Sequence, residues 1–275
     1  SPLLYQLSYI TIWRAKVGKN HGLQNIFGFG YQVSCIRINC SQIYSMNLTI
    51  DIGNTFIKTV VFNDTTPVYR DVSKALSSGH INRLVREFPI DYCMLSSVLN
   101  VSKPLLSRLR KLPDFEIFSS STSIPVKNLY ETPKTLGNDR LANAIAGAFL
   151  FPRKNVLIID AGTCIKYDFV NARNEYLGGS ISPGLEMRFK ALHHFTGKLP
   201  LVKEAEVKVI TGRSTVKAIQ TGVIIGIVEE IRGFIYRYQN KYKSIEVIFT
   251  GGDAYRFAGE LNLSIFAAAD LVNIG

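Results

Sequence analysis

The chain has 275 residues, of which 47% are hydrophobic and 19% are charged. This length and apolar content suffice for one large domain or two ordinary ones, and they exclude an intrinsically disordered chain. The net charge of +11 fits a nucleic-acid partner or an anionic ligand, but no run of Lys or Arg exceeds two residues. Small phosphorylated molecules therefore explain the charge as well as a nucleic-acid surface does, and we expect no nucleic-acid partner.

The cysteine and hydropathy patterns are typical of a soluble intracellular protein. No apolar run approaches the roughly 18–20 residues that a membrane span requires, so we expect no membrane contact. The four cysteines are scattered and form no C-x-x-C pair, which argues against a disulfide framework. A reducing cytoplasm is the simplest interpretation.

Residues 1–45 differ from the rest of the chain. They hold four basic residues and no acidic one, and without them the chain has 28 basic and 21 acidic residues, a net charge of +7. They show neither the strand nor the helix period. A targeting segment is one interpretation, since transit peptides are basic and poor in acids. We favour an extension that is not part of the functional protein, ahead of a start at Met46.

Beyond Met46 the pattern alternates between strands and helices. The first stretch predicts strands at 47–51, 56–62, 68–72, 92–95 and 115–118 and helices at 81–88 and 103–112. The second begins with an Ala-rich helix and predicts helices at 141–151 and 215–242 and strands at 156–160, 164–170, 176–181 and 246–249. This alternation is typical of an α/β fold.

A weak internal repeat links the two stretches. In each, a strand ends in Asp, turns through Gly and Thr, and continues into a second strand, at 51–55 and at 160–163. The repeat predicts two related halves, which we place at 46–152 and 153–275.

The first turn, Asp51-Ile52-Gly53-Asn54-Thr55, has features of a phosphate site. Its glycine exposes backbone N–H groups that can cradle phosphate oxygens, and its carboxylate can hold hydrated Mg²⁺. Lys58 follows on the next strand and could neutralise phosphate charge. Taken alone, an ordinary hairpin with an Asx turn explains the same residues.

The second half carries two more turns of this kind. Asp160-Ala161-Gly162-Thr163 follows a buried strand, where a carboxylate is costly unless it is paired or bound to a cation. Gly251-Gly252 follows a third buried strand, and paired glycines let a flat ligand or a phosphate approach the backbone. Plain strand-end turns remain the alternative for both.

Gly137-Asn138-Asp139-Arg140 opens the Ala-rich helix. Asp139 falls in the first turn, where it complements the helix dipole, so a capping role is one interpretation. The functional alternative is a base that takes the proton of a substrate hydroxyl, with Arg140 binding a carboxylate through a bidentate fork. Neither a Walker-type G-x-x-x-x-G-K-[ST] loop nor a G-x-S-x-G elbow occurs in the chain.

The combination is more specific than its parts. Two Asp-Gly-Thr turns followed by Thr-Gly-Gly resemble the actin/hexokinase/Hsp70-like ATPase superfamily. Within it, the order and spacing of five strings resemble the type III pantothenate kinases: 51–55, 137–140, 160–163, 178–184 and 250–252. The resemblance covers Met46 to near the C-terminus and leaves out residues 1–45.

The resemblance implies a fold, a reaction and ligands. The fold would be α/β, with two related ribonuclease H-like domains and an active-site cleft between them. The reaction would be ATP-dependent phosphorylation of pantothenate to 4′-phosphopantothenate, the first step towards coenzyme A. The ligands would be ATP with Mg²⁺ and a monovalent cation, K⁺ or ammonium, and the protein would be a homodimer.

The resemblance also implies roles for individual residues. Asp139 would be the catalytic base, Asp160 would hold the monovalent cation, and Asp51 would hold Mg²⁺ with ATP. ATP would contact Asp51, Ile52, Gly53, Asn54, Thr55, Phe56, Ile57, Lys58, Thr163, Gly251 and Gly252. Pantothenate would contact Tyr130, Gly137, Asn138, Asp139, Arg140 and Thr215.

The chain departs from the family pattern at two positions. Asn138 stands where alanine is common, and Lys166 stands where a small polar residue is common. Two other functions remain open at this point: a catalytically silent relative acting as a regulatory accessory factor, and a different kinase or phosphohydrolase of the same superfamily. The intact Asp51, Asp139, Arg140 and Asp160 argue against the first, and the Gly-Asn-Asp-Arg string against the second.

Overall fold

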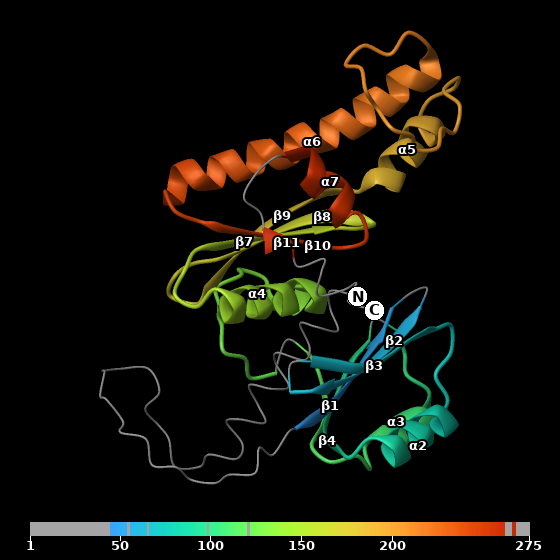
Figure 1. Cartoon of the computed structure of the whole chain (residues 1–275), viewed down its shortest axis with the longest axis vertical. Coiled ribbons are helices and arrows are strands. Elements are labelled where there is room, and N and C mark those ends of the chain that lie inside the picture. Colours follow the sequence, from blue (N-terminus) through green and yellow to red (C-terminus); the bar gives the residue numbers. More distant parts are fainter. Residues whose placement is uncertain are drawn as a thin grey trace. The chain divides into compact units, whose positions relative to one another are not determined.

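Two β-sheets, each in its own unit, organise the part of the chain that the structure describes. The computed structural model describes residues 45–53, 56–64, 66–97, 99–119, 122–261 and 266–267. Its described residues up to 123 form a first unit, and those from 124 onward form a second (Figure 1). Residues 1–44, and with them nearly all of the expected extension, lie outside the described residues.

The first unit is a five-stranded sheet with the order β3-β2-β1-β4-β5. Its strands are β1 (Met46–Ile52), β2 (Ile57–Asn63), β3 (Thr66–Ser73), β4 (Ile90–Ser97) and β5 (Phe115–Ile117). β1, β2 and β3 are antiparallel neighbours, whereas β4 and β5 run parallel to β1. Two helices, α2 (Ser78–Glu87) and α3 (Lys103–Leu109), bury their apolar residues against Leu48 and Ile50 of β1.

The second unit is built around a six-stranded sheet with the order β11-β10-β7-β8-β9-β6. Its strands are β6 (Lys127–Asn128), β7 (Val156–Ala161), β8 (Cys164–Val170), β9 (Glu175–Pro183), β10 (Glu246–Thr250) and β11 (Phe266–Ala267). Its helices are the short η1 (Pro133–Thr135), α4 (Asn138–Leu150), α5 (Leu185–His194), α6 (Thr215–Tyr242) and α7 (Ala254–Leu261). Figure 1 shows α4 on one face of this sheet and α6 on the other.

The two sheets repeat one topology. In both, three consecutive strands form antiparallel neighbours and two later strands run parallel to the first of the three, so β9-β8-β7-β10-β11 matches β3-β2-β1-β4-β5. The second sheet has β6 as an additional strand beside β9. This confirms the α/β class and gives the sequence repeat a structural counterpart. The finer expectation, ribonuclease H-like domains with a cleft between them, stays a prediction.

The division between the units differs from the expected boundary after residue 152. It lies between residues 123 and 124, so α4 belongs to the second unit. The reason is packing: a Cβ on Gly147 of α4 would lie 2.8 Å from the side chain of Ile158 on β7. The pairing of β6 with β9 also places residues 127–128 in the second sheet.

Most expected elements are confirmed to within a few residues, and three helix ends differ by three residues. α2 begins at Ser78 rather than 81. α4 begins at Asn138 rather than 141, because Gly137 is its N-cap. α3 ends at Leu109 rather than 112. In the described part of the chain, no helix combines the length and the apolar character needed to cross a membrane.

We predict that Gly251→Ala destabilises the second unit. Gly251 has φ +98°, which an alanine adopts only with strain, and an added Cβ would lie 2.2 Å from the carbonyl oxygen of Ala161. We expect the free energy of unfolding to fall by about 1–3 kcal/mol from the backbone strain alone. Urea unfolding measures it, and Gly252→Ala is the matched control, since nothing lies within 4 Å of its Cβ position. Equal losses in the two variants would contradict the prediction.

Candidate active site

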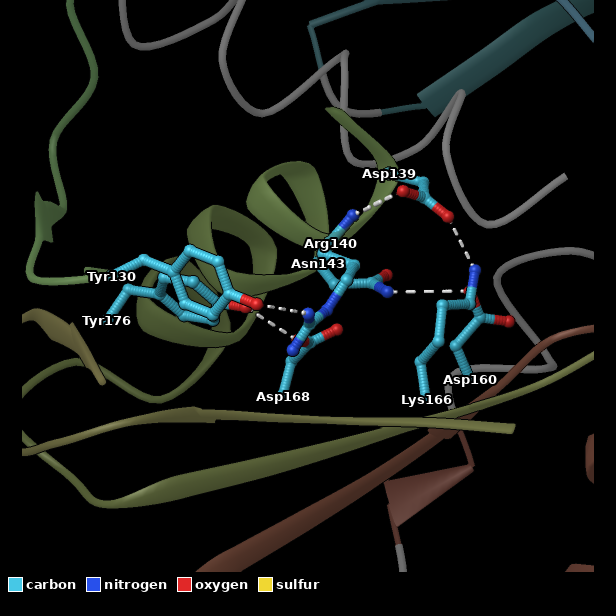
Figure 2. Close-up of polar contacts among 8 residues, drawn as sticks. All are labelled: Tyr130, Asp139, Arg140, Asn143, Asp160, Lys166, Asp168 and Tyr176. Carbon is cyan, nitrogen blue, oxygen red and sulfur yellow. Dashed lines mark hydrogen bonds and ion pairs between the residues drawn. The ribbon is translucent and has the colours of Figure 1, made fainter. Parts of the chain in front are cut away.

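The alternation of β7 and β8 directs three charged side chains to one face of the second sheet. Successive residues of a strand point to opposite faces. Leu157, Ile159 and Tyr167 belong to the core cluster that includes α6. Asp160, Lys166 and Asp168 therefore point to the other face, where α4 lies, and Figure 2 shows them beneath that helix.

Helix α4 presents the sequence-predicted base to this face. Asp139 lies in its first turn, and its Oδ1 accepts a hydrogen bond from the backbone N–H of Arg140 at 2.9 Å. Gly137 makes room for this arrangement, because a Cβ there would lie 2.5 Å from the same Oδ1. The side chain of Asp139 remains 41% exposed, which leaves its carboxylate accessible to a substrate.

Lys166 joins two carboxylates. Its Nζ lies 2.6 Å from Asp139 Oδ2 and 2.7 Å from Asp160 Oδ2. Asn143 of α4 donates a longer hydrogen bond of 3.5 Å to the same oxygen of Asp160 (Figure 2). Burial alone would lower the pKa of Lys166, but the charges of Asp160 and Asp139 outweigh it and raise the pKa above its usual range.

A second ion pair lies deeper under α4. Arg140 Nε donates to Asp168 Oδ1 at 2.8 Å, and the two residues are 5% and 0% exposed. Tyr176 donates its hydroxyl to the same oxygen at 2.8 Å, and the guanidinium carbon lies 5.4 Å from the ring centre of Tyr130. Within the described part of the chain, Arg140 Nη2 and Asp168 Oδ2 are buried without a hydrogen-bond partner.

The structure thus brings together Asp139, Arg140, Tyr130 and Asp160 of the expected set, and it adds residues that sequence reasoning missed. Asp168 and Tyr176 had no assigned role, and Lys166 was noted only as a departure from the family pattern. One signal was available in the sequence. Lys166 and Asp168 are two residues apart in the otherwise largely apolar strand 164–170, so both charged side chains point to the same face of the sheet.

Thr215 is not brought to this cluster. It is the first residue of α6, on the opposite face of the sheet from α4, and it lines a separate cavity of about 1180 Å³ between α5 and α6. Its expected role in substrate binding stays a prediction.

Asn138, another expected substrate residue, is the first residue of α4.

The expected nucleotide residues of the second unit lie near one cavity. Thr163 lines a cavity of about 510 Å³, together with Gly162 and with Asp253. Gly251 and Gly252 immediately precede Asp253, whose backbone N–H bonds the carbonyl of Ala161 at 3.0 Å.

In the first unit, Asp51 and Lys58 lie opposite each other on β1 and β2, as Asp160 and Lys166 do on β7 and β8. Gly53 closes the turn by donating its N–H to the carbonyl of Phe56 at 3.1 Å. Ile52 is buried and Ile57 half-buried, whereas Asn54 and Thr55 lie outside the described residues.

The two expected metal positions differ in their fit. The carboxylate of Asp51 suits Mg²⁺, which is held by one or two carboxylates together with phosphate oxygens and water. Asp160 does not fit its expected role as the ligand of a monovalent cation, because the ammonium of Lys166 already contacts its Oδ2. Among the described residues, no group of three or more His, Cys, Asp or Glu could hold a metal ion.

We predict that Asp168→Asn strongly destabilises the protein. The substitution leaves the guanidinium of Arg140 buried without its counter-charge, which costs about 3–5 kcal/mol in typical buried pairs. Glu186→Gln is the control, because its ion pair with Lys190 is exposed and such pairs contribute at most about 1 kcal/mol. Chemical unfolding of both variants at pH 7 measures the difference. A loss below 1 kcal/mol for Asp168→Asn would contradict the prediction.

The chain is similar to one family over most of its length. The family model described as type III pantothenate kinase matches residues 47–237. The type III pantothenate kinase of Bacteroides fragilis strain YCH46 is 44% identical over 228 residues, which cover 82% of this chain and 94% of the relative. That of Cytophaga hutchinsonii is 43% identical over 234 residues, covering 84% and 96%.

Among solved structures, the inorganic polyphosphate/ATP-glucomannokinase of an Arthrobacter strain aligns with 80% of this chain and 90% of its own. The identity is 14% and the TM-score 0.37, so this likeness carries no weight for function. The sequence relatives and the family model decide the assignment: the chain belongs to the type III pantothenate kinase family.

Proposed function

We propose that this protein catalyses the ATP-dependent phosphorylation of pantothenate to 4′-phosphopantothenate, the first step towards coenzyme A. The observation that carries the proposal is the placement of Asp139: an accessible carboxylate one residue before a buried arginine that has an unpartnered nitrogen. Family membership supplies the substrate, and this arrangement supplies a base beside an anion-binding group.

Asp139 is proposed as the general base. A carboxylate has about four lone-pair positions, so the contacts with the N–H of Arg140 and with Lys166 leave positions for a substrate hydroxyl. Asp139 accepts the proton of the pantothenate primary hydroxyl. The hydroxyl oxygen bonds the γ-phosphorus of ATP, the bond to the bridging oxygen breaks, and ADP leaves. Such transfer depends mainly on positioning and charge neutralisation.

Arg140 is proposed to bind the pantothenate carboxylate. Its Nε is committed to Asp168, so the fork would use the two terminal nitrogens, one of which is buried without a partner. The ring of Tyr130 lies against the guanidinium and Asp168 holds it from below, which limits its rotation. A guanidinium fixed in this way would bind a carboxylate at little cost in side-chain entropy.

The nucleotide is proposed to bind both Asp-Gly turns. The turn at 51–58 would hold the phosphates, with Lys58 neutralising their charge, and Thr163, which lines the 510 Å³ cavity, would contact the same phosphates. Gly251 and Gly252 would border adenosine. Asp51 would hold Mg²⁺ with the phosphate oxygens, and that ion would offset charge on the transferring group. We also propose a homodimer, as expected from the resemblance.

The proposal predicts that Asp139→Asn lowers turnover by about 10²-fold or more, the usual scale for a positioned base. Formation of phosphopantothenate from ATP and pantothenate is measured by mass spectrometry. Stability should fall by no more than about 1 kcal/mol, the contribution of a first-turn acid to the helix dipole. Glu206→Gln, at an exposed position, is the control. Turnover within threefold of wild type would reduce Asp139 to a capping residue.

Gly137→Ala should separate positioning from folding. Its φ of −63° and ψ of 136° suit alanine, but the new Cβ would displace the Asp139 carboxylate. A misplacement of this kind can cost about 10²-fold in rate, so we expect turnover to fall at least tenfold at nearly unchanged melting temperature. Gly259→Ala on α7 has open space at its Cβ and is the control. Unchanged turnover in Gly137→Ala would contradict the positioning role.

A further inference from the structure

We infer that the ε-ammonium of Lys166 takes the place of a dissolved monovalent cation at Asp160, so that this kinase works without added K⁺ or ammonium. Lys166 is here a positioning residue that also orients Asp139. The inference rests on the proposed function for its kinetic part only.

The geometry puts one positive charge where two carboxylates converge. The distances from Lys166 Nζ to Asp139 Oδ2 and Asp160 Oδ2, 2.6 and 2.7 Å, are those of charge-assisted hydrogen bonds. A cation bound to Asp160 between the two carboxylates would have to displace Nζ. The lysine ammonium has three hydrogen-bond donors and no acceptor. It resembles a free ammonium ion in this respect, because that ion also has only donors.

The backbone fixes this placement. Lys166 lies directly opposite Asp160 in the antiparallel ladder of β7 and β8, so the two Cβ atoms are close cross-strand neighbours. The Lys166 side chain is only 17% exposed, in contrast to a surface lysine such as Lys154, which is 58% exposed. A charge attached to the ladder loses no translational freedom when it meets its partner, whereas a dissolved ion does.

The charge balance points the same way. Asp139 and Asp160 together carry two negative charges, and like charges this close repel each other. The ammonium offsets one of them and bonds both residues. Asp139 is thereby held by Lys166 at Oδ2 and by the helix backbone at Oδ1, which fixes the orientation of the proposed base.

The first test uses the wild-type protein. Initial rates with ATP and pantothenate are compared with and without KCl or ammonium chloride, with ionic strength held constant by tetramethylammonium chloride. We expect rates equal within experimental error. A severalfold rise with K⁺ in the wild type would overturn the inference.

Two variants separate the charge from the space it fills. Lys166→Thr removes the charge and opens the site. Without K⁺, we expect its turnover to fall about tenfold or more, the usual cost of removing a residue that orients a functional side chain. Turnover should recover when K⁺ or ammonium is added. Lys166→Met keeps the apolar stem without the charge, so it should be slow and should not recover. Lys154→Thr removes an exposed lysine paired with Glu246 and should behave as wild type.

Melting temperature gives a readout that does not depend on activity. A ligand that binds only the folded state raises the melting temperature. K⁺ should therefore stabilise Lys166→Thr relative to tetramethylammonium, and it should not stabilise wild type or Lys166→Met. A folded Lys166→Thr that is indifferent to K⁺ in both rate and melting would overturn the inference. If neither the wild type nor any of these variants forms phosphopantothenate in any salt, the proposed function fails. The melting temperatures still decide the role of Lys166.

Discussion

The antiparallel pairing of β7 with β8 is the constraint on which the rest of the site depends. It sets Asp160 opposite Lys166 and Ile158 opposite Asp168, and it turns all four toward α4. The odd-numbered residues of the same strands supply the apolar face that packs with α6. One ladder therefore places core residues on one face of the sheet and three charged residues, Asp160, Lys166 and Asp168, on the other. A slip of one residue would exchange the two faces, so the buried apolar face fixes the register of the charged one.

The buried charges of this face depend on being paired with opposite charges. Asp168 and Arg140 are almost fully buried, and each would be costly without the other. The tyrosine at 176 adds a third group to this pair, and β6 brings Tyr130 beside it by pairing with β9, with the two rings 6.1 Å apart. The buried pair then holds the first turn of α4 from within, while the Lys166 cluster holds it at the surface.

Much of this arrangement was predictable from the sequence, because its signals are local. The Asp-Gly turns, the Gly-Asn-Asp-Arg helix start and the alternation of strands and helices all lie within short windows. The contacts of Lys166, Asp168 and Tyr176 were missed because they depend on which residues face each other across three strands. The expected boundary after residue 152 differs from the division at 123/124 for a similar reason. The strands that pack against α4 follow it in the chain, so the local sequence alone does not show that the helix belongs with them.

Both halves place a lysine across the ladder from an aspartate that is the last residue but one of its strand, Lys58 opposite Asp51 and Lys166 opposite Asp160. The backbone hydrogen bonds of such a hairpin are the same whatever side chain stands at the lysine position, so that position can change without loss of the sheet. The two copies of this hairpin can therefore use the lysine position for different purposes. In the second copy the lysine supplies the counter-charge of the aspartate opposite it, so a substitution at this one position would remove the counter-charge while leaving the strand pairing in place.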